Sequence, residues 1–89
     1  MGRREKVIHV IDGDTFETAS RKHPVRLANV DTPERGQPGY GEAKQALEQL
    51  IGGKSVDIET KARDTYGRSV ANVSVAGRSV NASMKPHGK

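Results

Sequence analysis

The sequence contains no cysteine and no tryptophan, and its three aromatic residues are Phe16, Tyr40 and Tyr66. The absence of cysteine excludes a disulfide framework, a thiolate metal site and a thiol nucleophile. Because large aromatic side chains are scarce, small aliphatic residues have to build the core of this 89-residue chain. A chain of this size buries only about two-thirds of the surface that its unfolded form exposes. We therefore expect one domain, residues 1–89, of modest stability.

Long apolar runs are also absent. No segment approaches the roughly 20 apolar residues that a membrane-spanning helix requires. The segment Val7–Ile11, which follows a charged start, is too short to be the apolar core of a signal peptide. We expect a soluble protein with no membrane role, cytoplasmic by default and monomeric.

The charge balance is basic, with a formal net charge of +4 and an isoelectric point near 9.7. A basic surface is typical of proteins that bind polyanions such as nucleic acids. Small domains are also basic for solubility alone, so the charge by itself leaves both interpretations open.

Turn residues and alternation predict five strands in this chain. Asp12-Gly13 forms the first turn, and Pro33 cannot continue the third strand because it lacks a backbone N–H. Residues 1–5 are expected to form a charged tail, and residues 84–89 a flexible one. The predicted strands cover residues 6–11, 15–19, 25–30, 56–60 and 69–75.

One helix is predicted between the third and fourth strands. Its apolar residues recur at the i, i+3, i+4, i+7, i+8 spacing of a single helix face, and Gly52-Gly53 supplies a C-terminal stop. Pro86 and Gly88 argue against a long closing helix. These elements predict a mainly β domain, with a small curved sheet closed into a barrel and the helix capping one end. The residues of the helix stripe are Ala43, Ala46, Leu47, Leu50 and Ile51.

Acidic residues cluster where two strands end. Asp12 and Asp14 follow the first strand, and Asp31 and Glu34 follow the third. If these ends lie close together, Asp14, Asp31 and Glu34 could converge on one hard cation, because oxygen-only ligands suit calcium or magnesium. The alternative is that the aspartates only form turns, where Asp is common.

Two arginines accompany these carboxylates. Arg26 lies inside an otherwise apolar strand, and Arg68 stands directly before another. A buried guanidinium needs anionic partners, which a structural ion pair would supply. Alternatively, Arg26 and Arg68 could clamp a phosphate, since the guanidinium fork matches phosphate oxygens. Carboxylates, a metal ion and two arginines are the set that phosphodiester hydrolysis needs.

Four short motifs occur in a distinctive order and spacing. Together they resemble the staphylococcal nuclease (thermonuclease) family, and Gly41-Glu42-Ala43 and Val80-Asn81 agree with it as well, so the resemblance covers about residues 6–83. It implies an OB-type barrel with one main helix after the third strand. The motifs are Ile11-Asp12-Gly13-Asp14-Thr15, Val25-Arg26-Leu27, Val30-Asp31-Thr32-Pro33-Glu34 and Asp64-Thr65-Tyr66-Gly67-Arg68.

The resemblance also implies a calcium-dependent endonuclease that acts on single-stranded DNA and on RNA and leaves a 3′-phosphate. Arg26 and Arg68 would bind the scissile phosphate, and Glu34 would hold the attacking water. The implied calcium ligands are the carboxylates of Asp14 and Asp31 and the backbone carbonyl of Thr32, with Asp12 behind them and Tyr66 against the substrate.

Two departures from the family pattern bear on substrate binding. Thr65 stands where the family has a basic residue, and the tyrosines that stack on the nucleotide beyond the barrel have no counterpart. We therefore expect weak substrate binding, and a C-terminal segment that closes the barrel poorly. Two other interpretations remain open: a non-catalytic OB-type module that binds nucleic acid or protein, and a fragment that folds only marginally.

Overall fold

The structure, a computed structural model, describes residues 3–88 as a mainly β domain. None of the helices among these residues has the length and apolar character needed to cross a membrane. In chain order the elements are β1 (Arg3–Asp12), β2 (Thr15–Thr18), β3 (Val25–Leu27), α1 (Tyr40–Ile51), β4 (Ser55–Arg63), β5 (Ser69–Val75), β6 (Arg78–Ser79), α2 (Val80–Met84) and the 3₁₀ turn η1 (Lys85–His87).

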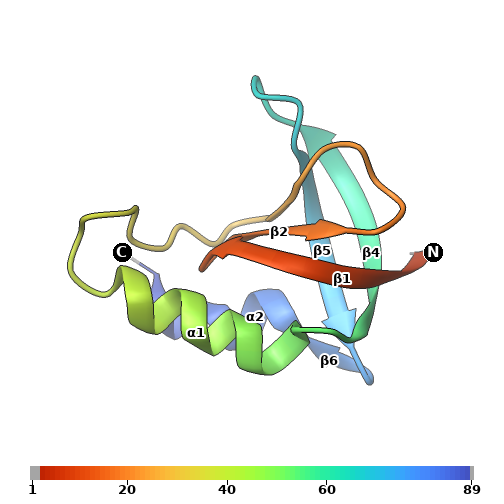
Figure 1. The fold of residues 1–89 in the computed structure, drawn as a ribbon. Helices are drawn as coiled ribbons and strands as arrows, with labels where there is room; N and C mark the ends of the chain where they lie inside the picture. The colour runs from red at the N-terminus through yellow and green to blue at the C-terminus, as the bar shows by residue number, and fades with distance from the viewer. Residues whose placement is uncertain (1–2, 89) are drawn as a thin grey trace.

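Five of the strands close into a ring (Figure 1). The sheet order is β3-β2-β1-β4-β5-β6, and β3 additionally pairs with β5 in parallel, which joins the two ends of the five-stranded part. A closed, highly curved five-stranded sheet is the architecture of an OB-type fold. The fold class predicted from the sequence is therefore confirmed, and the two-residue strand β6 is an addition to it.

The first strand begins earlier than the sequence predicts. Residues 3–5 belong to β1, so the expected charged tail is wrong for them, while residues 1–2 lie outside the described part of the chain. The reason is that the stretch from Arg3 to Lys6 pairs antiparallel with β4. Glu5 within it is buried, because its carboxylate accepts hydrogen bonds from Thr18, Ser20 and Arg21.

The third strand is shorter than predicted and ends at Leu27. Asn29 adopts a φ of 60°, a left-handed conformation that takes the chain out of the ladder. Asn81 then fixes the loop that follows, because its amide nitrogen donates to the carbonyl of Ala28 at 2.9 Å and to that of Ala71 at 3.1 Å. The loop leading to the acidic residues after β3 is thereby tied to β5.

The two helices pack together against one side of the ring (Figure 1). Ala43, Leu47 and Ile51 of α1 are buried, as the predicted stripe requires. Val80 and Met84 of α2 are fully buried as well, so this segment contributes to the core rather than closing the barrel poorly. The expected tail from residue 84 is therefore wrong at its start, since Met84 ends α2 and η1 follows it; Lys89 lies outside the described residues.

Candidate active site

The turn between β1 and β2 carries Asp14, whose carboxylate is held from two sides. The Thr15 hydroxyl donates to its Oδ1 at 2.9 Å, and the Thr32 backbone N–H donates to its Oδ2 at 3.2 Å. Asp12 stabilises the same turn, because its carboxylate accepts the backbone N–H of Asp14 at 3.2 Å. This turn interpretation of Asp12 is therefore correct, but Asp14 is also bonded to the loop after β3.

Gly13 allows the turn to approach that loop. A Cβ at this position would lie 2.6 Å from the Cβ of Ala43 and 2.8 Å from Oγ1 of Thr32. Such distances are well inside van der Waals contact, so the glycine is required by close packing. The packing brings Asp14, the start of α1 and the Thr32 loop into one cluster.

Arg26 connects the two aspartates. Its Nη2 lies 3.5 Å from Oδ2 of Asp14 and 3.6 Å from Oδ1 of Asp31, and its Nη1 donates to the carbonyl of Leu27 at 3.1 Å. The partly buried guanidinium of Arg26 thus has the anionic partners that are expected for a buried charge, namely Asp14 and Asp31. Asp14 is nearly buried, whereas the Asp31 side chain remains 69% exposed and is free to meet a ligand.

Arg68 follows the turn between β4 and β5 and is fixed by Asp64. The backbone N–H groups of Tyr66 and Arg68 each donate to Oδ1 of Asp64 at 2.9 Å, and Nε of Arg68 donates to Oδ2. The Arg68 guanidinium lies over the Tyr66 ring, 5.4 Å from its centroid. The arginine is therefore held in one orientation by a carboxylate and an aromatic face.

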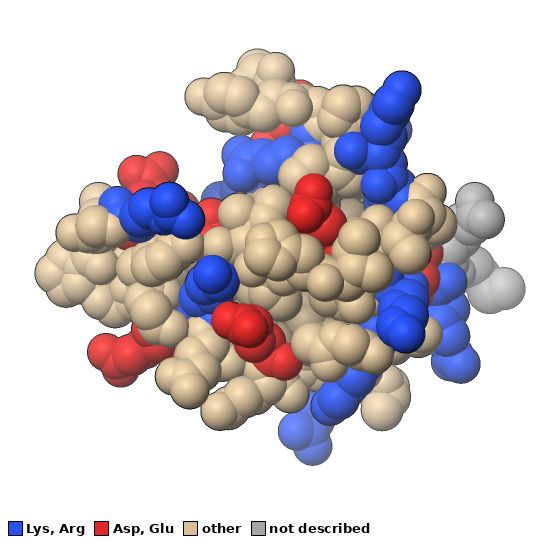
Figure 2. Space-filling model, in the orientation of Figure 1, with Lys and Arg blue, Asp and Glu red and all other residues tan. Residues whose placement is uncertain are grey.

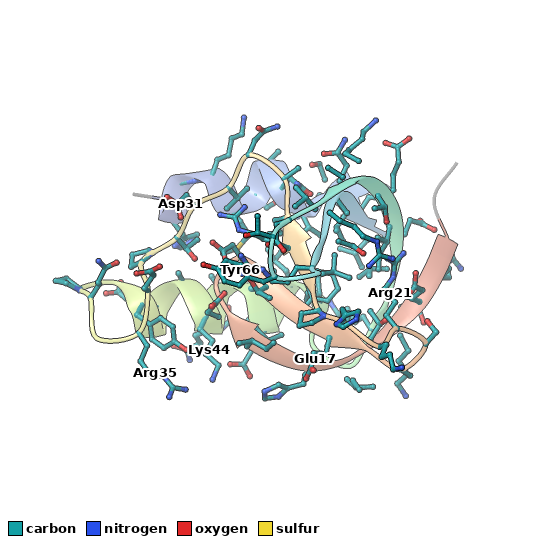
Figure 3. The ribbon with its side chains drawn as sticks, turned by 90° about the horizontal axis from the view of Figure 1, so that it is seen from above. Glu17, Arg21, Asp31, Arg35, Lys44 and Tyr66 are labelled. Atoms are coloured by element: carbon teal, nitrogen blue, oxygen red, sulfur yellow. The ribbon has the colours of Figure 1, made fainter. Side chains whose placement is uncertain are left out.

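The acidic residues after β1 and β3 line one cleft of about 130 Å³ together with Arg26 and Arg68. It contains every residue proposed from the sequence except Tyr66, which is 77% exposed and reaches the cleft only through its contact with Arg68. Figure 3 shows Asp31 and Tyr66 in the view from above the ring. The residues lining the cleft are Asp12, Asp14, Arg26, Asp31, Thr32, Pro33, Glu34 and Arg68.

The two neighbouring aspartates of the cleft differ in acidity. Burial, together with the hydrogen bond and charge of Asp14, raises the pKa of Asp12 to about 6. Burial also acts to raise the pKa of Asp14, but hydrogen bonds from Asp12, Thr15 and Thr32 and the charge of Arg26 outweigh it and hold this pKa below its usual value. Asp14 is therefore the more acidic carboxylate of this pair.

Comparison with known proteins identifies the family. Residues 24–88 match the family model described as "Staphylococcal nuclease homologue". The chain belongs to this family. The family expected from the motifs is thereby confirmed, and the matched stretch includes the cleft residues from Arg26 to Arg68.

Relatives in the staphylococcal nuclease family are longer than this chain. Protein ParB of Escherichia coli is 35% identical over 96% of this chain and 54% of its own length. An uncharacterized endonuclease of Escherichia coli O157:H7 is 37% identical, over 89% of this chain and 54% of its own length. The micrococcal nuclease of Shigella flexneri is 36% identical, over 79% of this chain and 41% of its own length. The chain therefore spans about half the length of these relatives.

The calcium ion that the family resemblance implies would need oxygen donors from the cleft. Among residues 3–88, no three acidic or histidine side chains lie close enough together to hold a metal ion, so the expected convergence of Asp14, Asp31 and Glu34 is not seen. Calcium, however, accepts backbone carbonyls and waters among its six to eight oxygen ligands. Asp14 and Asp31, which share Arg26 as a neighbour, fit such an oxygen-only site in a cleft that Thr32 also lines.

Some residues that build the cleft were missed by the sequence argument. Asp64 was quoted within a motif but given no role, although it fixes Arg68. An Asp at the start of a turn, bonded to backbone N–H groups two and four residues later, is the signal that could have identified it. The hydroxyl of Thr15 and the amide of Asn81 left no comparable signal, because their partners are distant or depend on the turn geometry.

Proposed function

We propose that this chain is a calcium-dependent nuclease that hydrolyses phosphodiester bonds in single-stranded DNA and in RNA. The observation that carries the proposal is the shared cleft, which is lined by two arginines and four carboxylates, two from the end of β1 and the turn after it and two from the loop after β3. Hydrolysis of a phosphodiester requires charge neutralisation at the phosphoryl oxygens and a carboxylate that handles water. Membership in the staphylococcal nuclease family, with relatives named as nucleases, supports the same activity.

In this proposal Arg26 and Arg68 bind the scissile phosphate from two sides. Both are charged at any physiological pH and present several N–H donors. Arg68 is pre-oriented by Asp64, so little conformational entropy is lost when it binds an oxyanion. Arg26 lies between Asp14 and Asp31 in the absence of substrate, which keeps its side chain inside the cleft.

Glu34 is proposed to hold the attacking water. It lines the cleft from an exposed loop, and its backbone N–H is fixed by the Gln37 side chain at 2.8 Å. The water oxygen forms a bond to phosphorus while the bond from phosphorus to the 5′-oxygen breaks. The water proton passes to the Glu34 carboxylate, and the departing 5′-oxygen takes a proton from solvent. The products are a 3′-phosphate and a 5′-hydroxyl.

Asp14, Asp31 and the Thr32 carbonyl are the residues that would hold calcium. Calcium, when bound, supplies positive charge that neutralises the phosphoryl oxygens. Asp14 contributes a carboxylate that stays ionised, and Asp31 contributes an exposed one. Asp12 would not bind calcium directly. It fixes the turn between β1 and β2 and forms hydrogen bonds with Asp14.

Tyr66 is the proposed contact for a base of the substrate. Its exposed ring offers a stacking face, and stacking on aromatic side chains is how OB-type domains bind single strands without sequence preference. Because Tyr66 is the single strongly exposed aromatic side chain among the described residues, we propose weak substrate binding with retained chemistry. We also propose that the chain acts as a monomer.

The test is hydrolysis of heat-denatured DNA at alkaline pH, with calcium and then with a chelator. We expect calcium-dependent cleavage that Arg68→Ala abolishes and that Glu34→Gln lowers by about 10²- to 10⁴-fold, since the amide keeps the shape but cannot accept a proton. Activity that survives Glu34→Gln unchanged would indicate a contaminant or another base. A folded protein that does not cleave would favour the alternative function, a non-catalytic OB-type module that binds nucleic acid or protein.

A further inference from the structure

A second depression lies beside the cleft and is lined by basic and hydroxyl side chains. Its volume is about 240 Å³, and no acidic residue lines it. The loop between β2 and β3 forms one wall and the ends of β4 and β5 form the other. We call it the basic pocket; its lining residues are Ser20, Arg21, Lys22, His23, Arg63 and Ser69.

The positive charge of the basic pocket is only partly neutralised. Arg21 is paired with Glu5, since its Nη2 lies 2.8 Å from Oε2 of that buried carboxylate. Lys22 and Arg63 are exposed, and within residues 3–88 no carboxylate lies in ion-pair distance of either. Two unpaired cations therefore flank a depression that also contains the Ser69 hydroxyl, whereas the Ser20 hydroxyl donates to Glu5.

Arg21 lines the pocket, and its guanidinium is held by several polar contacts. Besides its ion pair with Glu5, its Nη1 donates to the hydroxyl of Ser69 at 3.0 Å and to that of Thr60 at 3.3 Å. These contacts join the β2–β3 loop to both β4 and β5. Arg21 therefore ties the loop that carries Lys22 to the strand that carries Arg63, the two residues that have no carboxylate partner within residues 3–88.

The basic pocket and the cleft share a wall. Arg68 lines the cleft and the next residue, Ser69, which begins β5, lines the pocket. His23 packs against Gly67, because a Cβ added to this glycine would lie 3.7 Å from Nδ1 of His23. Arg63 contacts the same glycine, since its Nη1 donates to the Gly67 carbonyl at 3.3 Å. The turn that carries Arg68 therefore separates the two depressions and contacts both.

Basic side chains gather on the side of the molecule that carries the β2–β3 loop. In the view of Figure 3, Tyr66 lies between Asp31 on the cleft side and Arg21 on the pocket side. Figure 2 shows Lys and Arg side chains gathered at the upper right, over the top of β4 and the β2–β3 loop. A strand that leaves the cleft past Tyr66 would meet this positive surface.

We propose that Lys22, His23 and Arg63 form a second phosphate subsite, which binds a backbone phosphate of the strand whose scissile phosphate lies at Arg26 and Arg68. The inference rests on the proposed function and extends it to longer substrates. An ammonium, a guanidinium and an imidazole beside the Ser69 hydroxyl match the charge and hydrogen-bonding capacity of a phosphodiester. The subsite offsets the scarcity of exposed aromatic side chains by adding ionic contacts along the strand.

The experiment measures binding without cleavage, in a Glu34→Gln background. Fluorescence anisotropy gives the affinity for a labelled single-stranded DNA of about 10 nucleotides, a length within the range that one OB-type domain covers. A nucleoside 3′,5′-bisphosphate and inorganic phosphate serve as short competitors. The test variant is Lys22→Ala/Arg63→Ala. The matched control, Lys54→Ala/Arg78→Ala, removes the same two residue types from a different depression, next to β6.

We expect the test variant to bind the oligonucleotide about 10-fold more weakly than the control, with a slope of log K against log salt that is smaller by about 1 to 2. Affinity for the bisphosphate should remain equal in both variants, because it reaches only the cleft. Cleavage of a dinucleotide substrate by Lys22→Ala/Arg63→Ala in the Glu34 background should also be unchanged.

Equal oligonucleotide affinity and equal salt slope in the two variants would overturn the subsite, even if the unmodified chain cleaves DNA. If inorganic phosphate binding is lost in the test variant while oligonucleotide binding is not, the pocket is a free-phosphate site and the inference is again wrong. If the unmodified chain does not cleave but Lys22→Ala/Arg63→Ala still weakens strand binding selectively, the subsite stands and the nuclease proposal fails. A Glu34→Gln protein that binds no strand would overturn both.

Discussion

Asp64 holds Arg68 by its main chain and its side chain at once. One carboxylate oxygen accepts the Arg68 backbone N–H at 2.9 Å, and the other accepts Nε of the guanidinium. Burial acts to raise the pKa of Asp64, but hydrogen bonds from Arg68 and from the Tyr66 N–H, together with the charge of Arg68, outweigh it and lower this pKa, so the carboxylate remains charged at neutral pH. Asp64 is thus a positioning residue for an arginine proposed to bind phosphate.

Asp64→Ala should therefore lower the turnover number about 10- to 100-fold, because a misplaced Arg68 no longer meets the transition state. Steady-state kinetics should show the loss mainly in kcat. Asp57→Ala is the control, since Asp57 forms only an exposed pair with Arg4 at 3.9 Å, and it should leave kcat unchanged. The double variant Asp64→Ala/Arg68→Ala should bind a nucleoside 3′,5′-bisphosphate no more weakly than Arg68→Ala alone; additive losses of this affinity would show that Asp64 acts independently of Arg68.

Gly13→Ala should damage both stability and the cleft. The new methyl group would lie 2.6 Å from the Cβ of Ala43, so the turn or α1 has to move, at a cost of about 1–3 kcal/mol. The displaced turn carries Asp14 away from Thr32, and cleavage should fall with stability. Urea unfolding and an activity assay measure the two effects.

Gly41→Ala is the matched control for this substitution. Gly41 lies in the first turn of α1, and no atom lies within 4 Å of its added Cβ. Alanine is the better helix former, so this variant should be as stable as the original chain or more stable, by up to about 1 kcal/mol. Equal stability of Gly13→Ala and Gly41→Ala would contradict the packing role given to Gly13.

Much of the fold could be predicted because its signals are local. The stripe from Ala43 to Ile51 predicts α1, and the Ala76-Gly77 turn, where both residues have positive φ, ends β5 as expected. The cleft was expected only on the condition that the ends of the first and third strands lie close together. That condition depends on the pairing of β1 with β2 and of β2 with β3, which local spacing does not specify.

The remainder depends on contacts between distant residues. Residues 3–5 form a strand because β4 is there to pair with them, and no local pattern contains that information. The segment after Ser79 packs into the core because Val80 and Met84 meet a face that several strands build together. The basic pocket was missed for the same reason, as Lys22 and Arg63 are far apart in sequence and each resembles an ordinary surface charge.

The ion pair of Glu5 with Arg21 should make stability depend on pH in the acid range. Burial alone would raise the pKa of Glu5, but hydrogen bonds from Arg21, Ser20 and Thr18 outweigh it, and the net pKa is lowered from 4.5. A lowered folded-state pKa means that this stabilisation is complete above about pH 4.5 and is lost as the pH falls through the folded value.

Glu5→Gln should therefore lower the free energy of unfolding at pH 7 by about 2–4 kcal/mol, because Arg21 loses its buried partner. The difference in the free energy of unfolding between the original chain and Glu5→Gln should shrink as the pH falls below 4.5. Urea titrations at several pH values measure it. Glu59→Gln, in which an exposed carboxylate next to Lys61 is removed, is the control and should leave the acid dependence of stability nearly unchanged. A constant difference at all pH values would show that Glu5 stabilises the fold by packing alone.

Calcium and a nucleotide should stabilise the folded chain together, if the cleft binds both. A ligand present at about 100 times its dissociation constant adds about 2.7 kcal/mol, which raises the Tm of a domain of this size by about 10 °C or more. Thermal melts with calcium, with a nucleoside 3′,5′-bisphosphate and with both measure this coupling. Asp31→Asn is the informative variant: the side chain is 69% exposed, so the protein should fold while losing the calcium-dependent part of the shift. An equal shift in Asp31→Asn would place the bound calcium elsewhere, and no shift in the original chain would argue against the enzyme.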